Sequence, residues 1–149
     1  MAQVEASGPA VPSGPCNKTT FATHVGLAQG AVNRYLWKPL QGGAFADNAA
    51  NRVKTLRNGA DAGRLAAREL AAASPLITGC PLSIPLVNAL TTGTSLAKAA
   101  GTQLAAGTPN LETLAGVNSI LSTVVAQASK IGIKVTETAP TPAQLAVKG

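Results

Sequence analysis

The sequence is poor in aromatic and charged residues: only 3% of its 149 residues are aromatic and 12% are charged. A core must therefore be built mainly from Ala, Leu, Val and Ile, and a hydrophobic content of 46% is enough for one domain of this length. Gly, Thr, Asn, Lys or Arg interrupts every apolar run, so we expect no transmembrane segment. The composition also excludes a disordered acidic chain.

Residues that carry catalytic or metal chemistry are equally scarce. One histidine and two cysteines exclude multi-cysteine zinc modules and most catalytic zinc sites. The six acidic residues form no paired-carboxylate pattern, and the sequence has no nucleophile motif and no phosphate-binding or dinucleotide-binding loop. We therefore expect a protein that is not an enzyme and that holds no metal or cofactor.

Apolar residues recur at steps of three and four in four segments, which is the period of an α-helix. The first begins after Asn17, a good N-cap, and Pro39 followed by Gly42-Gly43 should end it. The second begins at Asp47, the third near Ser83, and the fourth follows the turn at 107–110 and closes at Gly132. Four amphipathic helices of similar length with short connections predict an all-α, up-down four-helix bundle. The predicted core stripes are Phe21, Val25, Ala28, Val32 and Tyr35; Ala49, Val53, Leu56, Ala60, Gly63, Ala67 and Leu70; Leu86, Leu90, Gly93, Ala97, Ala100 and Leu104; and Leu111, Leu114, Val117, Leu121, Val124, Ala128 and Ile131.

The two ends of the chain differ from this helical region. Residues 1–15 are rich in Pro and Gly and predict a flexible leader, so that the bundle spans 16–132. Residues 133–149 are rich in Thr and Pro and predict a flexible tail, parts of which could lie against the bundle through Ile133, Val135, Leu145 and Val147.

The two cysteines bear on the compartment. Cys16 precedes the first predicted helix and Cys80 the third, and in an up-down bundle these helices begin at the same end. The geometry favours a Cys16–Cys80 disulfide in an exported protein, because structural disulfides persist in oxidising compartments. The alternative is a pair of buried thiols in a cytosolic bundle. The start of the chain has no export signal, but its small, Pro-rich residues are also typical of a mature exported chain.

Basic residues are concentrated in the first two predicted helices. The net charge is +6, and seven of the twelve Lys and Arg residues lie between Arg34 and Arg68. Asp61 and Glu69 lie among these arginines, where ion pairs within the helix explain them. A basic face of this kind favours an anionic surface such as lipid head groups or a wall polymer, while the lack of aromatics argues against specific nucleic-acid recognition. The basic residues of this region are Arg34, Lys38, Arg52, Lys54, Arg57, Arg64 and Arg68.

The segment 24–40 contains the only His, Trp and Tyr of the chain. His24 and Tyr35 are three helical turns apart on one side of the first helix, and we consider them candidate contacts for a flat ligand such as haem. The alternative is that both lie at the edge of the core and hydrogen-bond locally. The candidate interaction surface comprises Arg34, Tyr35, Trp37, Lys38, Arg52 and Arg57. Gly26 and Gly30 predict a close helix contact.

The Ala/Thr/Gly-rich composition, the segment 24–40 and the two-cysteine helical layout resemble small exported proteins of actinobacterial cell envelopes. Cys16, Cys80 and the following Pro81-Leu82 are also similar to secreted haem carriers of the mycobacterial type. The first resemblance implies a secreted or envelope-associated, non-enzymatic protein that binds a protein partner, its own copies or an anionic surface. The second implies the alternative, a carrier of a small apolar or flat ligand such as haem or lipid.

Overall fold

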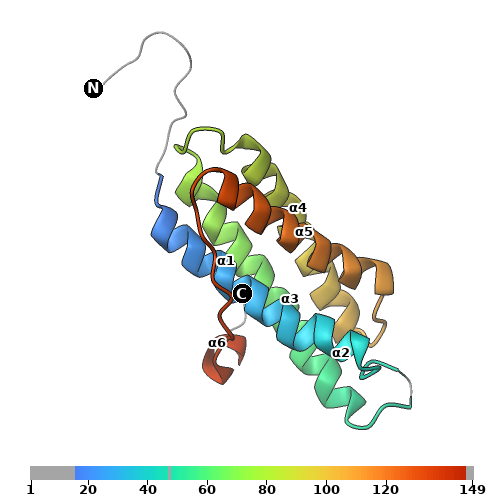
Figure 1. The fold of residues 1–149 in the computed structure, drawn as a ribbon. Coiled ribbons are helices and arrows are strands. Elements are labelled where there is room, and N and C mark those ends of the chain that lie inside the picture. The colour runs from blue at the N-terminus through green and yellow to red at the C-terminus, as the bar shows by residue number, and fades with distance from the viewer. Residues whose placement is uncertain (1–15, 47, 147–149) are drawn as a thin grey trace.

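The computed structural model describes residues 16–46 and 48–146, which form helices packed side by side (Figure 1). The prediction of an all-α four-helix bundle is confirmed, and this described part contains no strand. The predicted leader and Asp47 lie outside the described residues. The elements are α1 (Lys18–Val32), a π-helical turn (Asn33–Trp37), α2 (Lys38–Gln41), α3 (Arg52–Ala73), a 3₁₀ turn (Ser74–Ile77), α4 (Ile84–Ala105), α5 (Leu111–Lys130) and α6 (Pro142–Ala146).

The first long helix runs through α1, the π-helical turn and α2 without a break. Asn17 caps it as predicted, since its Oδ1 accepts a hydrogen bond from the Thr20 amide at 3.1 Å. The predicted end is wrong for Pro39, which lies in the first turn of α2, and right for Gly42, which directly follows the last helical residue, Gln41. Proline has no N–H, and its ring clashes with the carbonyl four residues earlier in a regular α-helix. The wider π-helical turn directly before Pro39 accommodates that ring.

The other long helices begin and end at recognisable local signals. The second begins at Arg52 rather than at Asp47, directly after Asn51 with a left-handed φ of 59°. Asn110 caps α5 through a 3.0 Å hydrogen bond from the Thr113 amide. Gly132, with a φ of 83°, turns the chain after α5, a conformation that glycine adopts without steric cost.

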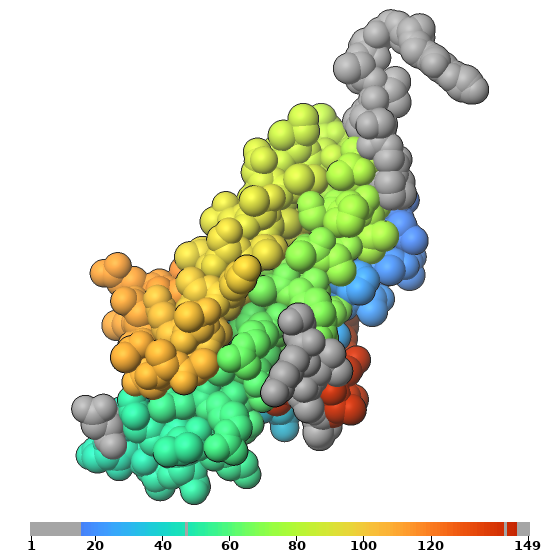
Figure 2. Space-filling view, turned by 180° about the vertical axis from the view of Figure 1, so that it is seen from behind, coloured from blue at the N-terminus to red at the C-terminus, as the bar shows by residue number. Residues whose placement is uncertain are grey.

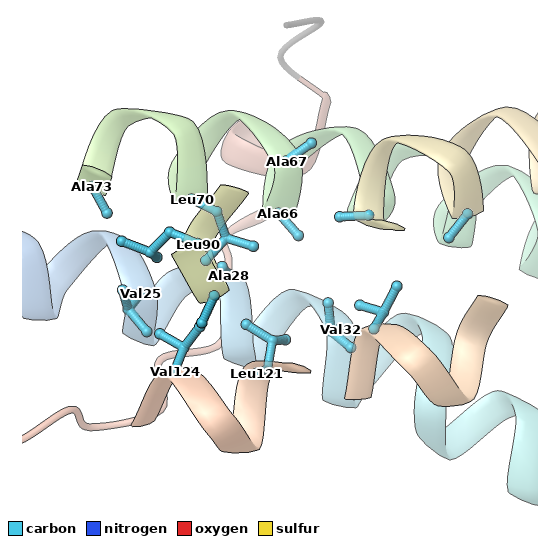
Figure 3. Packing of buried hydrophobic residues seen from close by; sticks show 14 of the residues in the cluster. Val25, Ala28, Val32, Ala66, Ala67, Leu70, Ala73, Leu90, Leu121 and Val124 are labelled. Atoms are coloured by element: carbon cyan, nitrogen blue, oxygen red, sulfur yellow. The ribbon is translucent and has the colours of Figure 1, made fainter. Parts of the chain in front are cut away.

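The core lies where α1, α3, α4 and α5 face each other. Val25 and Val32 of α1, Leu70 of α3, Leu90 of α4 and Val124 of α5 point toward a common interior (Figure 3). The predicted stripes therefore face the core over most of their length. Val53, which is 69% exposed, and Leu111, which is 65% exposed, do not face the core, since each lies in the first turn of its helix at the end of the bundle opposite the two cysteines, and Ala49 lies before α3.

Helices α3 and α4 approach most closely where two glycines meet. A Cβ atom placed on Gly63 would lie 2.8 Å from both the Cα and the amide nitrogen of Gly101, and 3.0 Å from the Ala97 carbonyl oxygen. At this crossing the two backbones are in direct contact. Glycine is required there because any side chain on Gly63 would push the helices apart.

Residues 133–146, which we call the C-terminal strap, lie along α1 and end in α6. The strap backbone crosses Gly26 and Gly30 so closely that a Cβ atom on either glycine would clash with the carbonyl of Thr136 or Thr138. The Thr138 amide also donates a 3.0 Å hydrogen bond to the Gly26 carbonyl. These glycines therefore form a close contact with extended chain instead of the predicted contact with a helix.

The two ends of the strap are fixed by apolar burial. Ile133 is 2% exposed in the main core, and Leu145 is 8% exposed in a second cluster formed by residues of α1 and α3. The prediction that apolar residues of this segment lie against the bundle is confirmed for both, while Val147 lies outside the described residues. The second cluster contains Leu27, Ala31, Ala62, Leu65 and Leu145, with Tyr35 partly buried against it.

Cys16 and Cys80 are joined in a disulfide, with 4.8 Å between their Cα atoms. The bond joins the residues before α1 to those before α4, at the end of the bundle where α3 and α5 finish. A 2.7 Å hydrogen bond from the Asn17 amide to the Leu76 carbonyl reinforces the same connection. The predicted pairing is confirmed.

Candidate functional site

A row of charged residues follows the outer side of α3. Lys54, Arg57, Asp61, Arg64 and Arg68 are spaced by three and four residues, so they share one face of the helix. We call this row the α3 stripe. It extends over about 21 Å at 1.5 Å per residue and carries four cations and one carboxylate. The outer side of α3 runs through the middle of the face in Figure 2, in green, with α4 beside it.

Three of the four positive charges of the α3 stripe are well exposed, while Arg68, at its end, is 31% exposed and lies 3.6 Å from Oε2 of Glu69. Lys54 and Arg57 are exposed, and 43% of the Arg64 side chain is exposed although it bonds to Asp61 at 3.3 Å. This pair has the (i, i+3) spacing, so the predicted ion pairing within the helix is confirmed for Asp61. The stripe keeps a net positive charge, because Lys54 and Arg57 are exposed in addition to the arginines that face Asp61 and Glu69.

A groove of about 470 Å³ lies between the first half of α3 and the last turn of α4. Its lining combines the arginines 57 and 64 with buried apolar side chains, among them Leu56 and Leu104. Arg52 lies at the end of this groove and donates hydrogen bonds to the carbonyls of Phe45, at 3.1 Å, and Gly107, at 3.4 Å. Arg52 therefore ties two loops together, whereas Arg57 projects into solvent.

The predicted interaction surface is divided between two grooves. Trp37 is half-buried and lines a groove of about 260 Å³ between α1 and α5, whose other wall includes Asn118 and Leu121. Arg52 and Arg57 line the α3–α4 groove instead. Arg34 and Lys38 are exposed on the π-helical turn and α2, and the Arg34 guanidinium lies 5.9 Å from the centroid of the Tyr35 ring.

His24 pairs with a residue that sequence reasoning had assigned to a different role. Its Nδ1 lies 2.7 Å from Oε1 of Glu69, and the two side chains are 28% and 12% exposed. Because a carboxylate only accepts, His24 donates this hydrogen bond. Oε2 of Glu69 lies 3.6 Å from Nε of Arg68. The pair links α1 to α3, while Tyr35 packs against the second apolar cluster.

This imidazole–carboxylate pair has the geometry of a histidine oriented by an acid. Nucleophilic catalysis also requires a hydroxyl or thiol within hydrogen-bond reach of the imidazole. The printed sequence offers no signal for the pairing, since 45 residues separate His24 from Glu69 and only the rotation of α1 against α3 brings them together. The pair connects α1 to α3, and we interpret it as a structural interaction between these two helices.

Among the described residues, no group of three or more His, Cys, Asp or Glu side chains is arranged to hold a metal ion. The described helices also include none with both the length and the apolar character that a bilayer span requires. Comparison with models of known protein families, with curated proteins and with solved structures found no match.

Proposed function

We propose that this chain is an exported, non-enzymatic interaction protein of the cell envelope that binds an extended polyanion along the α3 stripe. The observation that carries the proposal is the alignment of Lys54, Arg57, Arg64 and Arg68 on one face of a straight helix. A linear partner with regularly repeated negative charges matches such a row better than a compact anion does.

The position of the stripe beside the α3–α4 groove supports this assignment. Leu56, Ala60 and Leu104 form an apolar floor next to Arg57 and Arg64. Charges beside a low-dielectric surface interact more strongly with an approaching anion than charges surrounded by water. The groove therefore strengthens attraction at the centre of the stripe.

The disulfide supports the exported location. A Cys16–Cys80 bond persists in an oxidising compartment and is rare in the cytosol. The anionic polymers of a cell envelope are found in the same compartment as such a protein.

Binding to immobilised long-chain polyphosphate at several salt concentrations tests the proposal. Arg57→Gln should weaken binding and reduce the slope of log K against log salt by about one, because one phosphate contact is lost. The double variant Lys54→Gln/Arg57→Gln should reduce the slope by about two.

Lys98→Gln provides the matched control, because Lys98 is exposed on α4 and its replacement lowers the net charge by the same amount. We expect this variant to bind like the wild type, and dextran should bind neither protein. If Lys98→Gln weakens binding as much as Arg57→Gln, then binding follows net charge and the α3 stripe has no special role.

A further inference from the structure

The end of the bundle that carries the disulfide presents apolar side chains to solvent. Leu82 is 82% exposed and Ile84 is 73% exposed, and Pro81 and Pro85 beside them are exposed as well. We call residues 81–85 the apolar knuckle. Two large aliphatic side chains this exposed within three residues are typical of an interaction site, whereas single exposed apolar residues are common everywhere.

The backbone holds the apolar knuckle outward. Leu82 has a φ of 62°, a left-handed conformation that is unfavourable for a residue with a branched side chain. The residues on either side are anchored, since Cys80 is 1% exposed and disulfide-bonded and Ser83 is 3% exposed. Backbone strain that positions a side chain in solvent is a feature of binding sites.

Three lysines lie at the same end of the bundle. Lys18 is two residues from Cys16, which the disulfide joins to the start of the knuckle. A Cβ atom placed on Gly132 would lie 3.5 Å from Nζ of Lys18, so the turn that joins Lys130, the last residue of α5, to Lys134 passes Lys18.

A groove beside these lysines offers polar contacts. It has a volume of about 390 Å³ and is lined by Lys18 and Lys134, by three threonines and by the turn at Gly132. Ammonium groups and hydroxyls are the donors that bind phosphate oxygens. The lining threonines are Thr19, Thr23 and Thr136.

The carboxylates that the structure describes are engaged or distant. Glu69 is paired with His24, Glu137 accepts a hydrogen bond from Asn33, and Asp61 is paired with Arg64. Glu112 lies in the first turn of α5, at the opposite end of the bundle. The end that carries the apolar knuckle therefore combines exposed aliphatic side chains with positive charge.

We infer that this end of the bundle docks on an anionic lipid surface. Leu82 and Ile84 enter the boundary between head groups and acyl chains, while Lys18, Lys130 and Lys134 contact lipid phosphates. Apolar burial and attraction to anionic lipid act together at such an interface. This site goes beyond the proposed function, because the α3 stripe runs along the side of the bundle and stays accessible when the end is docked.

Co-sedimentation with vesicles tests the inference. The wild type should bind vesicles of phosphatidylcholine with 30% phosphatidylglycerol and bind pure phosphatidylcholine far more weakly. Leu82→Ser/Ile84→Ser should reduce the partition coefficient at least tenfold. Lys18→Gln/Lys134→Gln should reduce the partition coefficient about twenty-five-fold, because each lysine near the surface contributes about fivefold.

Val53→Ser/Leu111→Ser is the matched control, because it removes two exposed aliphatic residues at the other end of the bundle. This control should bind vesicles like the wild type. Equal binding by both serine double variants, or equal binding of the wild type to the two kinds of vesicle, would overturn the inference. Arg57→Gln separates the two proposals, because it should weaken polyphosphate binding and leave vesicle binding unchanged. An equal loss of both kinds of binding would contradict a lipid-binding site at the apolar knuckle that is separate from the α3 stripe.

Discussion

The glycine contact between α3 and α4 leads to a quantitative prediction for Gly63→Ala. The new methyl group would lie 2.8 Å from the Gly101 backbone and 3.0 Å from the Ala97 carbonyl oxygen, so the helices must separate. Overpacking of this kind costs about 1–3 kcal/mol, and we expect the upper part of that range because the neighbours are backbone atoms. Replacing a glycine inside a helix by alanine returns about 1 kcal/mol.

The expected net loss is therefore about 2 kcal/mol of unfolding free energy, which corresponds to a Tm lower by about 4–8 °C for a chain of this size. Circular dichroism at 222 nm during guanidinium and thermal unfolding measures both quantities. Gly116→Ala is the control, since its Cβ would meet only the side chain of Leu96, whose Cδ1 and Cδ2 would lie at the ordinary distances of 3.5 and 3.8 Å. It should raise the Tm by about 2–4 °C. If the Gly63→Ala variant is as stable as the Gly116→Ala variant, then α3 and α4 do not contact each other at Gly63 and Gly101.

Three further perturbations test other connections. Replacing Cys16 and Cys80 by Ser should lower the unfolding free energy in urea by about 4 kcal/mol, because the disulfide closes a loop with a sequence separation of 64. An unchanged urea midpoint would contradict a stabilising role of the disulfide. Gly30→Ala should accelerate hydrogen exchange of the Thr138 amide, since the added methyl group clashes with the strap, and unchanged exchange would mean that the strap lies elsewhere. Glu69→Ala should lower the unfolding free energy by about 1–2 kcal/mol, because the half-buried imidazole of His24 loses its hydrogen-bond acceptor. An unchanged unfolding free energy in denaturant would show that the His24–Glu69 pair contributes nothing to stability.

Local signals in the sequence were sufficient to predict the helices and the disulfide. Asn17 and Asn110 cap helices through hydrogen bonds to residues three positions ahead, and such short-range contacts can be recognised in a linear pattern. The up-down order of the helices then places Cys16 and Cys80 at one end, which is why their pairing could also be predicted.

Features that depend on the rotation of one helix against another could not be predicted. His24 meets Glu69 only because those particular faces of α1 and α3 are turned together. The grooves beside the predicted interaction surface also depend on this rotation, since Trp37 lines the groove toward α5 and Arg57 lines the groove toward the end of α4. The spacing of Gly26 and Gly30 predicted a close contact correctly, but it contained no information on which segment makes that contact.

The C-terminal strap has a consequence for the order in which the chain acquires its structure during synthesis. A ribosome produces α1 before the strap that covers its glycines, and the hydrogen bond between Asn33 and Glu137 spans 104 residues. One flank of α1 therefore stays exposed to solvent until the strap has been synthesised. Closing so long a loop carries a large entropic cost, so we expect strap docking to be a late kinetic step that follows assembly of the four long helices.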